Sequence, residues 1–503
     1  MRATVTAHRD YTISKIDERV YGAFLEHLGR AIYTGIYEPG HPTADKNGMR
    51  GDVAKLVKDI NIPVVRYPGG NFVSAYNWED GVGPRDQRPT RLDLAWHTSE
   101  SNAVGVHEFA DWCATVGTEM MLAVNLGSRG VDEARNFLEY VNHPGGSYWS
   151  DLRIKNGRKE PWNVKMWCLG NEMDGPWQVG HKDAAEYGKL AANTARAMRM
   201  FDKSLELIVC GSSNSDMPSY PDWERIVLEY TYDHVDHISL HMYFANREKN
   251  AANYLALNHK LETYIETVAS TIRQVKAKRK SKRDVYISFD EWNVWYHSNQ
   301  QDRKILEGAG GWPHAPGLLE DIYNFEDVLM VGLILNSFIR RADVVKIACI
   351  AQLVNVIAPI MTEKGGPAWA QTIYYPYYFA SVYGRGTALN LVVNSPSYES
   401  PHAAQTPYVD VSGVRNEADG TLTFFLVNRH ATETVETEVS LEGFADAQIV
   451  DHQVMTHTSL EAVNTATRQT EVAPRKGSGA SVANGKLSAK LPPYSYQMIR
   501  LKA

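Results

Sequence analysis

Two glutamates at the ends of short apolar runs are the residues in this sequence best suited to chemistry. Glu172 closes the run 165–172, and Glu291 follows the run 285–289. A buried strand that ends in a carboxylate is the pattern expected at the C-terminal rim of a (β/α)8 barrel. Two carboxylates that face one cavity can cleave a glycosidic bond. The pair therefore predicts a sugar hydrolase.

The residues beside the two glutamates suggest their roles. The carboxyl groups lie ~5–5.5 Å apart in retaining glycosidases and ~6.5–9.5 Å apart in inverting ones, and the sequence leaves both open. Asn171 can bond a sugar 2-hydroxyl, and ionised Glu291 would raise the pKa of Glu172, as an acid requires. Strand alternation would turn Asp290 away from Glu291, so we interpret Asp290 as a structural partner.

Metal-assisted hydrolysis is the main mechanistic alternative. His27, His241 and His297 lie at strand ends or in loops, but no HxH or HExxH pair gives ligand spacing. We therefore expect no metal or cofactor and interpret His241 as a hydrogen-bonding group. The turn 68–71 lacks the Lys and Ser/Thr of a phosphate-binding loop, so its glycines are expected to bring the backbone close to a sugar and aim Asn71.

Strand-length apolar runs recur along the first three quarters of the chain, separated by segments long enough for a helix. They are 21–25, 63–66, 120–125, 164–169, 207–210, 238–241, 285–289 and 345–351. The segments 184–200 and 254–276 have helical periodicity. This alternation predicts a (β/α)8 TIM barrel, and most of its strands end in polar residues. A doubly wound sheet is the competing fold, but no GxGxxG follows the first strand.

The pattern changes near residue 385. Short alternating runs such as 421–427, 436–441, 447–452 and 494–501 replace helical periodicity and predict a C-terminal antiparallel β-sandwich. The run 3–6 is expected to pair with it, and 471–483, rich in Lys, Gly and Ser, is expected to be an exposed loop. We therefore predict three units: an N-terminal strand segment (1–16), the catalytic barrel (17–384) and the sandwich (385–503).

Composition narrows the class of protein. The 503 residues are 44% hydrophobic and carry 52 basic against 59 acidic side chains, a net charge of −7. A large core is expected, and a nucleic-acid partner is not. The basic run 276–283 is interpreted as a solvated helix end.

Four cysteines without a CxxC pair indicate reduced, buried thiols. Without a signal-peptide pattern or an apolar run of ~20 residues, we expect a cytoplasmic protein that has no membrane partner.

Several motifs carry a resemblance that extends over essentially the whole chain. They are 21–27 (YGAFLEH), 66–72 (RYPGGNF), 167–177 (WCLGNEMDGPW), 241–243 (HMY) and 290–296 (DEWNVWY). The sequence resembles the α-L-arabinofuranosidases of glycoside hydrolase family 51. The resemblance implies a (β/α)8 barrel followed by a jelly-roll sandwich. It also implies an intracellular homohexamer.

The resemblance also implies an activity and a set of site residues. The expected reaction is retaining, exo-acting hydrolysis of terminal α-L-arabinofuranosyl groups from arabinan, arabinoxylan fragments and arabino-oligosaccharides, with Glu172 as acid/base and Glu291 as nucleophile. The residues expected to bind the cleaved sugar are Glu26, Asn71, Asn171, Tyr243 and Gln352, with Trp96 and Trp177 at the entrance and leaving-group side and Arg66 and His241 near the nucleophile. The linkage preference stays open, because loops such as 307–314 differ.

Two other functions remain open at this point. A β-xylosidase or an endoglucanase would use the same barrel architecture. A catalytically silent sugar-binding or scaffold protein belongs to a different class, but such a protein has no need for both Glu172 and Glu291.

Overall fold

A closed barrel of parallel strands forms the centre of the computed structural model, which describes residues 1–308, 310–444 and 446–503. Ala309, in the 307–314 loop, lies outside these ranges. The barrel strands are β3 (Gly22–Phe24), β4 (Val64–Tyr67), β7 (Glu119–Val124), β8 (Met166–Leu169), β9 (Glu206–Cys210), β10 (His237–Phe244), β11 (Tyr286–Val294) and β12 (Val345–Ala351). Each lies at one of the predicted apolar runs, so the predicted (β/α)8 barrel is confirmed.

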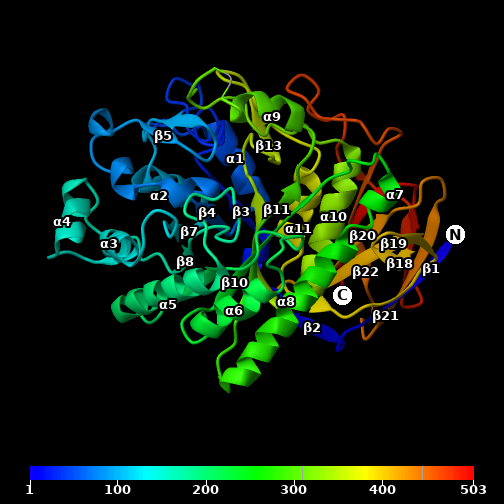
Figure 1. The fold of residues 1–503 in the computed structure, drawn as a ribbon. Coiled ribbons are helices and arrows are strands. Elements are labelled where there is room, and N and C mark those ends of the chain that lie inside the picture. Colours follow the sequence, from blue (N-terminus) through cyan, green and yellow to red (C-terminus); the bar gives the residue numbers. More distant parts are fainter. Residues whose placement is uncertain (309, 445) are drawn as a thin grey trace.

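Helices follow the barrel strands and surround them (Figure 1). They are α1 (Gly51–Ile60), α2 (Val106–Val116), α3 (Val131–Asn142), α4 (Tyr148–Lys155), α5 (Ala184–Phe201), α6 (Asp222–Thr231), α8 (Asn258–Arg279), α10 (Phe325–Arg340) and α11 (Tyr374–Tyr383). Because helices cover the barrel outside and side chains fill it inside, β4, β8 and β12 are buried almost throughout. This burial on both faces is why the strands appear as continuous apolar runs.

Short elements in the loops complete this unit. The loop helices are η1 (Glu18–Tyr21), η2 (Asn71–Ala75), η3 (Trp78–Gly81), η4 (Arg85–Gln87), α7 (Ala251–Tyr254) and α9 (Asn299–Leu306), and the loop strands are β5 (Arg91–Asp93), β6 (Thr98–Glu100), β13 (Ile360–Thr362) and β14 (Ala368–Ala370). None of the described helices combines the length and apolar character needed to cross a bilayer.

A β-bulge interrupts the pairing of β10 with β11. Ser239 pairs with Ser288 and His241 pairs with Glu291, so β11 holds one residue more than β10 between these pairs. A bulge shifts side-chain alternation by one position. Asp290 and Glu291 therefore both approach His241 and Arg66. The expectation that Asp290 points away from Glu291 is wrong, because simple alternation does not hold across the extra residue.

Two sheets packed on a shared apolar core form the C-terminal sandwich, at the right of Figure 1. The larger contains β2 (Thr12–Lys15), β15 (Thr387–Leu389), β19 (Val409–Asn416), β20 (Thr421–Asn428), β26 (Ser495–Lys502), β22 (Gln448–Thr456) and β23 (Arg475–Lys476). The smaller contains β16 (Val392–Asn394), β1 (Arg2–His8), β21 (Val435–Glu442), β25 (Lys486–Leu491) and β24 (Ala480–Ala483), and the hairpin β17 (Ser397–Ser400) and β18 (Ala403–Pro407) lies apart. All these pairs are antiparallel except β1 with β21.

Two details bear on the predicted organisation. The stretch 471–483 is not wholly a loop, because β23 and β24 lie within it at sheet edges. The N-terminal strand β1 lies between β16 and β21. The unit boundaries after residues 16 and 384 stay a prediction.

The basic run 276–283 lies at the end of α8 and just beyond it. Lys278 pairs with Glu229 and Arg283 with Asp236, so acidic neighbours neutralise much of its charge.

A buried charge network joins the sandwich to the barrel. Asp410 on β19 is 6% exposed and accepts hydrogen bonds from Arg340 of α10 and from Arg429, whose side chain is fully buried. Arg340 also pairs with Glu262 of α8. Two carboxylates thus face two guanidinium groups at the joint, and removal of Asp410 would leave the buried Arg429 without its carboxylate partner.

Replacing Asp410 by Ala is expected to destabilise the protein by about 3–5 kcal/mol, because the fully buried Arg429 loses its carboxylate partner. Urea unfolding followed by tryptophan fluorescence measures the change. Asp132→Ala is the control, since its pair with Arg135 is largely exposed and contributes little. Equal unfolding midpoints for the two variants would contradict the role of this network.

Candidate active site

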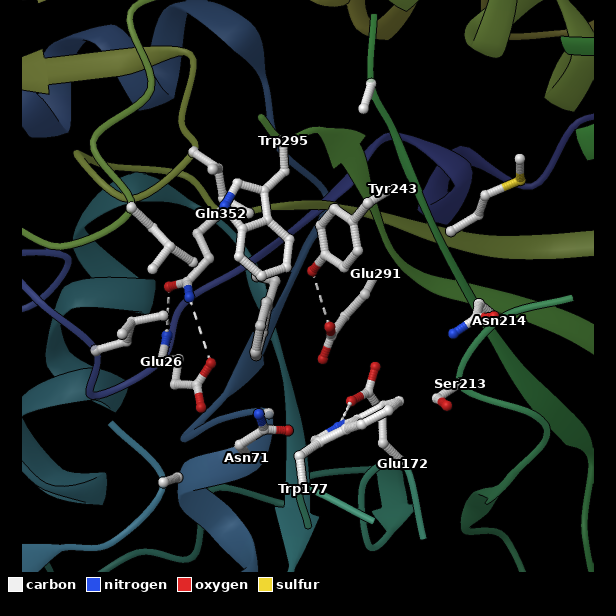
Figure 2. A pocket seen from close by; sticks show the side chains of 18 of the residues that line it. Glu26, Asn71, Glu172, Trp177, Ser213, Asn214, Tyr243, Glu291, Trp295 and Gln352 are labelled. Atoms are coloured by element: carbon white, nitrogen blue, oxygen red, sulfur yellow. Dashed lines mark hydrogen bonds between the residues drawn. The ribbon is translucent and has the colours of Figure 1, made fainter. Parts of the chain in front are cut away.

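One cavity of about 640 Å³ opens at the C-terminal ends of the barrel strands (Figure 2). Its lining includes most of the residues singled out in the sequence: Glu26, Asn71, Trp96, Glu172, Trp177, Tyr243, Glu291 and Gln352. The remaining three, Arg66, Asn171 and His241, are at most 2% exposed and lie behind these side chains. The tertiary structure thus brings the predicted residues together in two layers.

Glu291 ends the bulged part of β11 and is held by two donors. Arg66 donates from Nη1 to Oε1 at 2.7 Å, and the Tyr243 hydroxyl donates to Oε2 at 2.9 Å. Burial raises the pKa of Glu291; the positive charges of His241 and Arg66 oppose this shift, and the negative charge of Glu172 adds to it. The two donors orient the carboxylate toward the cavity.

Glu172 lies across the cavity, in the turn that follows β8. Trp177, 46% exposed, donates its indole N–H to Oε2 at 2.7 Å. The backbone φ of Glu172 is +43°, a left-handed conformation that non-glycine residues seldom adopt. Gly175 donates its N–H to the Glu172 carbonyl and closes this turn. Such outliers concentrate at functional sites, where the surroundings hold them.

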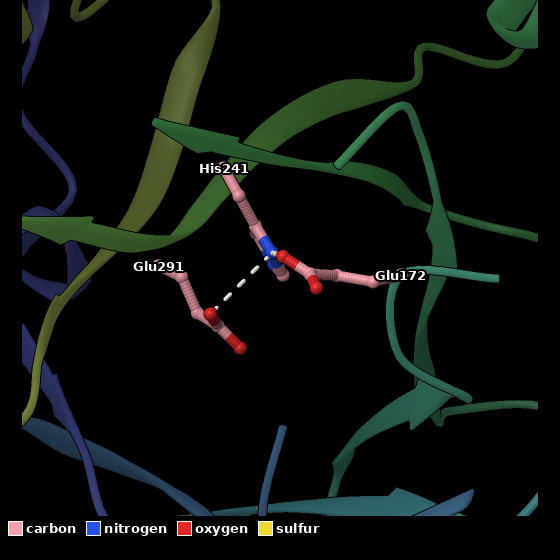
Figure 3. Close-up of side chains that lie close together, drawn as sticks. All are labelled: Glu172, His241 and Glu291. Carbon is pink, nitrogen blue, oxygen red and sulfur yellow. Dashed lines mark hydrogen bonds and ion pairs between the residues drawn. The ribbon is translucent and has the colours of Figure 1, made fainter. Parts of the chain in front are cut away.

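His241 lies between the two glutamates (Figure 3). Its Nδ1 is 2.8 Å from Glu172 Oε1 and 3.5 Å from Glu291 Oε2, and its Nε2 is 3.0 Å from Asp290 Oδ1. Burial alone would lower the pKa of His241, but the charges of Glu291, Asp290 and Glu172 outweigh it and raise the pKa to about 10. The ring is therefore an imidazolium at neutral pH, with both nitrogens donating.

Glu172, His241 and Glu291 are also side-chain types that bind metal ions. One atom each of Glu172, His241 and Glu291 lie within 4.8 Å of one another, which is compact enough for an ion. A metal needs the neutral imidazole with a free lone pair. In His241, Nδ1 is engaged by Glu172 and Nε2 by Asp290, so neither nitrogen has a free lone pair for an ion. This donor set does not fit a metal.

Glu26 and Gln352 form the opposite end of the cavity. Glu26 accepts hydrogen bonds from the Phe72 amide at 2.8 Å and the Trp96 indole at 3.0 Å, while its own amide donates to Gln352 Oε1 at 2.9 Å. Burial, followed by the charge of Glu291, raises the pKa of Glu26 to about 8. A side chain at Gly70 would place Cβ 2.5 Å from the Glu26 carboxyl, so a larger residue there would force this carboxyl to shift from its present contacts.

Two family models match consecutive parts of the chain. The α-L-arabinofuranosidase 1 domain matches residues 56–263, and the α-L-arabinofuranosidase C-terminal domain matches residues 290–495. The intracellular exo-α-(1→5)-L-arabinofuranosidase 1 of Bacillus subtilis is 54% identical over 501 residues, which cover 100% of this chain and 99% of the relative. The chain belongs to the α-L-arabinofuranosidases of glycoside hydrolase family 51.

Other members of family 51 agree with this assignment. An exo-α-(1→6)-L-arabinofuranosidase of Bifidobacterium longum is 47% identical, covering 98% of this chain and 96% of the relative. A solved family 51 α-L-arabinofuranosidase, also from Bifidobacterium longum, superposes with a TM-score of 0.94 at 40% identity and 99% coverage of both chains. The predicted family and enzyme class are confirmed: this family 51 chain is a glycoside hydrolase.

The sugar contact predicted for Asn171 stays a prediction at this family 51 site. Its side chain is 1% exposed and accepts from Arg66 Nη2 at 2.6 Å. His27, which follows β3, contacts Tyr67, and Asn125, which follows β7, donates to the Tyr76 carbonyl. Sequence reasoning missed Trp295, which lines the cavity, although it lies within the motif 290–296.

The raised pKa of Glu26 predicts a pH-dependent stability. The folded enzyme holds this proton more tightly than the unfolded chain, so the stabilisation is complete below about pH 4.5 and is lost as pH rises through about 8. Glu26→Gln has no group to titrate there, and we expect its Tm to rise relative to wild type from pH 5 to 8. The surface variant Glu119→Gln serves as control. A Tm difference that stays constant over this range would refute the shift.

Proposed function

We propose that this family 51 enzyme hydrolyses terminal α-L-arabinofuranosides with retention, by double displacement. The observation that carries this proposal is the approach of Glu172 and Glu291, whose nearest ligand atoms are within 4.8 Å. Inverting enzymes need ~6.5–9.5 Å between carboxyl groups to accommodate a water, whereas retaining enzymes need ~5–5.5 Å. Carboxylate oxygens this close favour the retaining arrangement, in which the carboxylate itself attacks and no water has to fit between the pair.

In the first step Glu291 attacks the anomeric carbon and the bond to the leaving oxygen breaks. Glu172 gives its proton to that oxygen, and a glycosyl ester forms on Glu291. In the second step Glu172, now ionised, takes a proton from water, whose oxygen attacks the anomeric carbon and releases Glu291. Arg66 and Tyr243 supply the contacts that aim Glu291. Trp177 supplies the contact that orients Glu172.

The two ends of the cavity suit different parts of the substrate. Glu26, Asn71 and Gln352 offer convergent polar groups, which suit the hydroxyls of the cleaved arabinofuranose, and Asn171 supports Asn71 from behind through a side-chain contact of 3.4 Å. In the view of Figure 2, Ser213 and Asn214 lie beyond Glu172, away from Glu26. With Trp177 they form the wall for the leaving sugar, and Trp96 stands at the entrance.

We propose arabino-oligosaccharides, arabinan and arabinoxylan fragments as substrates. The relative at 54% identity is named for the (1→5) linkage and the one at 47% for the (1→6) linkage. The higher identity favours α-(1→5)-linked substrates, so we expect that preference. Action inside the cell is proposed because the Bacillus subtilis relative is named intracellular. The homohexamer implied by the family stays a prediction.

Replacing Glu291 by Ala is expected to abolish turnover of aryl α-L-arabinofuranosides, because no carboxylate remains to form the glycosyl ester. Azide can enter the space left by the side chain and attack directly, giving a glycosyl azide of inverted configuration. Product NMR gives the stereochemistry, and wild type is expected to release arabinose with retention. The proposal would be contradicted if the variant turned over substrate at the wild-type rate, or if the wild-type enzyme released arabinose of inverted configuration.

Replacing Glu172 by Ala tests the acid role by a different signature. Substrates with poor leaving groups need protonation, so we expect kcat/KM for them to fall by about 10²–10⁴-fold. Substrates with good leaving groups, such as 2,4-dinitrophenyl glycosides, need no proton for the first step and are expected to lose far less. Equal losses for both classes of substrate would contradict the assignment of Glu172.

A further inference from the structure

Asp290, which lies behind the cavity, has no part in the two-carboxylate mechanism. We propose that Asp290 is a positioning residue that holds His241 as an imidazolium and directs its Nδ1–H to both catalytic glutamates. Asp290 is fully buried and touches His241 Nε2 at 3.0 Å, on the side of the ring opposite to Glu172. The inference rests on the proposed roles of Glu172 and Glu291.

The bulge in β11 is what makes this contact possible. Without the extra residue, Asp290 and Glu291 would face opposite sides of the strand. With it, Asp290 reaches Nε2 of His241 while Glu291 lies 3.5 Å from Nδ1. The ring is thus held between a fixed anion on one side and the two glutamates on the other. An imidazole that accepted at Nε2 would turn a lone pair toward the Asp290 carboxylate.

The charges that face His241 come from several strands. Glu172 follows β8, Asp290 and Glu291 belong to β11, and Arg66 of β4 lies beyond Asp290 and Glu291 at 3.9 and 2.7 Å. Arg66 compensates part of the negative charge but donates no bond to the ring. The Ser239 hydroxyl also lies 3.2 Å from Nε2, and it donates to Asp290 Oδ1. Each ring nitrogen therefore faces a carboxylate, and Asp290 is the carboxylate that takes no part in the proposed steps.

This arrangement matches how negative charge moves during double displacement. Before the first step the charge is on Glu291; in the glycosyl ester Glu291 is neutral and the charge is on Glu172. His241 Nδ1 is within reach of both carboxylates, at 3.5 and 2.8 Å. A cation at this point stabilises the charge in both positions without moving. Asp290 keeps that cation in place, whereas a neutral imidazole has one N–H and could donate either to Asp290 or to the glutamates, not to both sides.

Asp290→Asn keeps the shape and removes the charge. We expect kcat to fall by about 10- to 100-fold at neutral pH, with KM within about twofold because Asp290 does not line the cavity. The loss is expected to grow as pH rises, since at low pH His241 is protonated without Asp290. In ¹⁵N-histidine-labelled enzyme, the His241 signal, identified by its absence in His241→Gln, is expected to titrate about 1–3 units lower in the variant.

Asp327→Asn is the matched control, because Asp327 is another fully buried aspartate that bonds a histidine, His297, at 2.9 Å. Its effect on kcat is expected to be independent of pH. A wild-type His241 that is neutral at pH 8 would overturn the proposal even if Asp290→Asn does not fold. An unchanged His241 titration or an unchanged kcat in Asp290→Asn would do the same. None of these three outcomes affects the Glu291→Ala and Glu172→Ala tests, so the two proposals fail separately.

Discussion

Three carboxylates converge on two cations at the rim of the barrel, and the site depends on this balance. Glu172, Asp290 and Glu291 lie around His241 and Arg66, and all five are largely withdrawn from water. Buried like charges repel strongly, so three carboxylates at these distances cannot all be ionised without opposite charge among them. The imidazolium and the guanidinium supply it.

The barrel makes this convergence possible because all its strands run in one direction. Side chains that are far apart in sequence, such as Arg66 on β4 and Glu291 on β11, meet at the same rim. Local backbone features then adjust single positions: the β11 bulge brings Asp290 alongside Glu291, and Gly70 lets the backbone pass within contact of Glu26. The left-handed turn at Glu172 places its carboxylate opposite Glu291.

The sandwich contributes stability rather than chemistry. None of the described cavity-lining residues belongs to its two sheets. Its core of aliphatic and aromatic side chains is a separate cluster from that of the barrel. The contact between the two is in large part apolar, because Phe425 and Val427 of β20 and Tyr496 of β26 belong to the core cluster of the barrel. Asp410 and its two arginines add directional polar bonds that restrict how the sandwich can dock.

The sequence by itself determined the barrel, because strands buried on both faces appear as apolar runs that can be counted, and polar residues at their ends mark the rim. It also determined which side chains would gather there, since parallel strands bring their ends together. It could not determine how they are layered. Burial places Asn171 and His241 behind the cavity. A one-residue bulge places Asp290 on the same side as Glu291. Alternation along a strand is a local rule, whereas the bulge arises from pairing with β10. The raised pKa of Glu26 arises first from burial and that of His241 from charged neighbours, and only the closed barrel provides both.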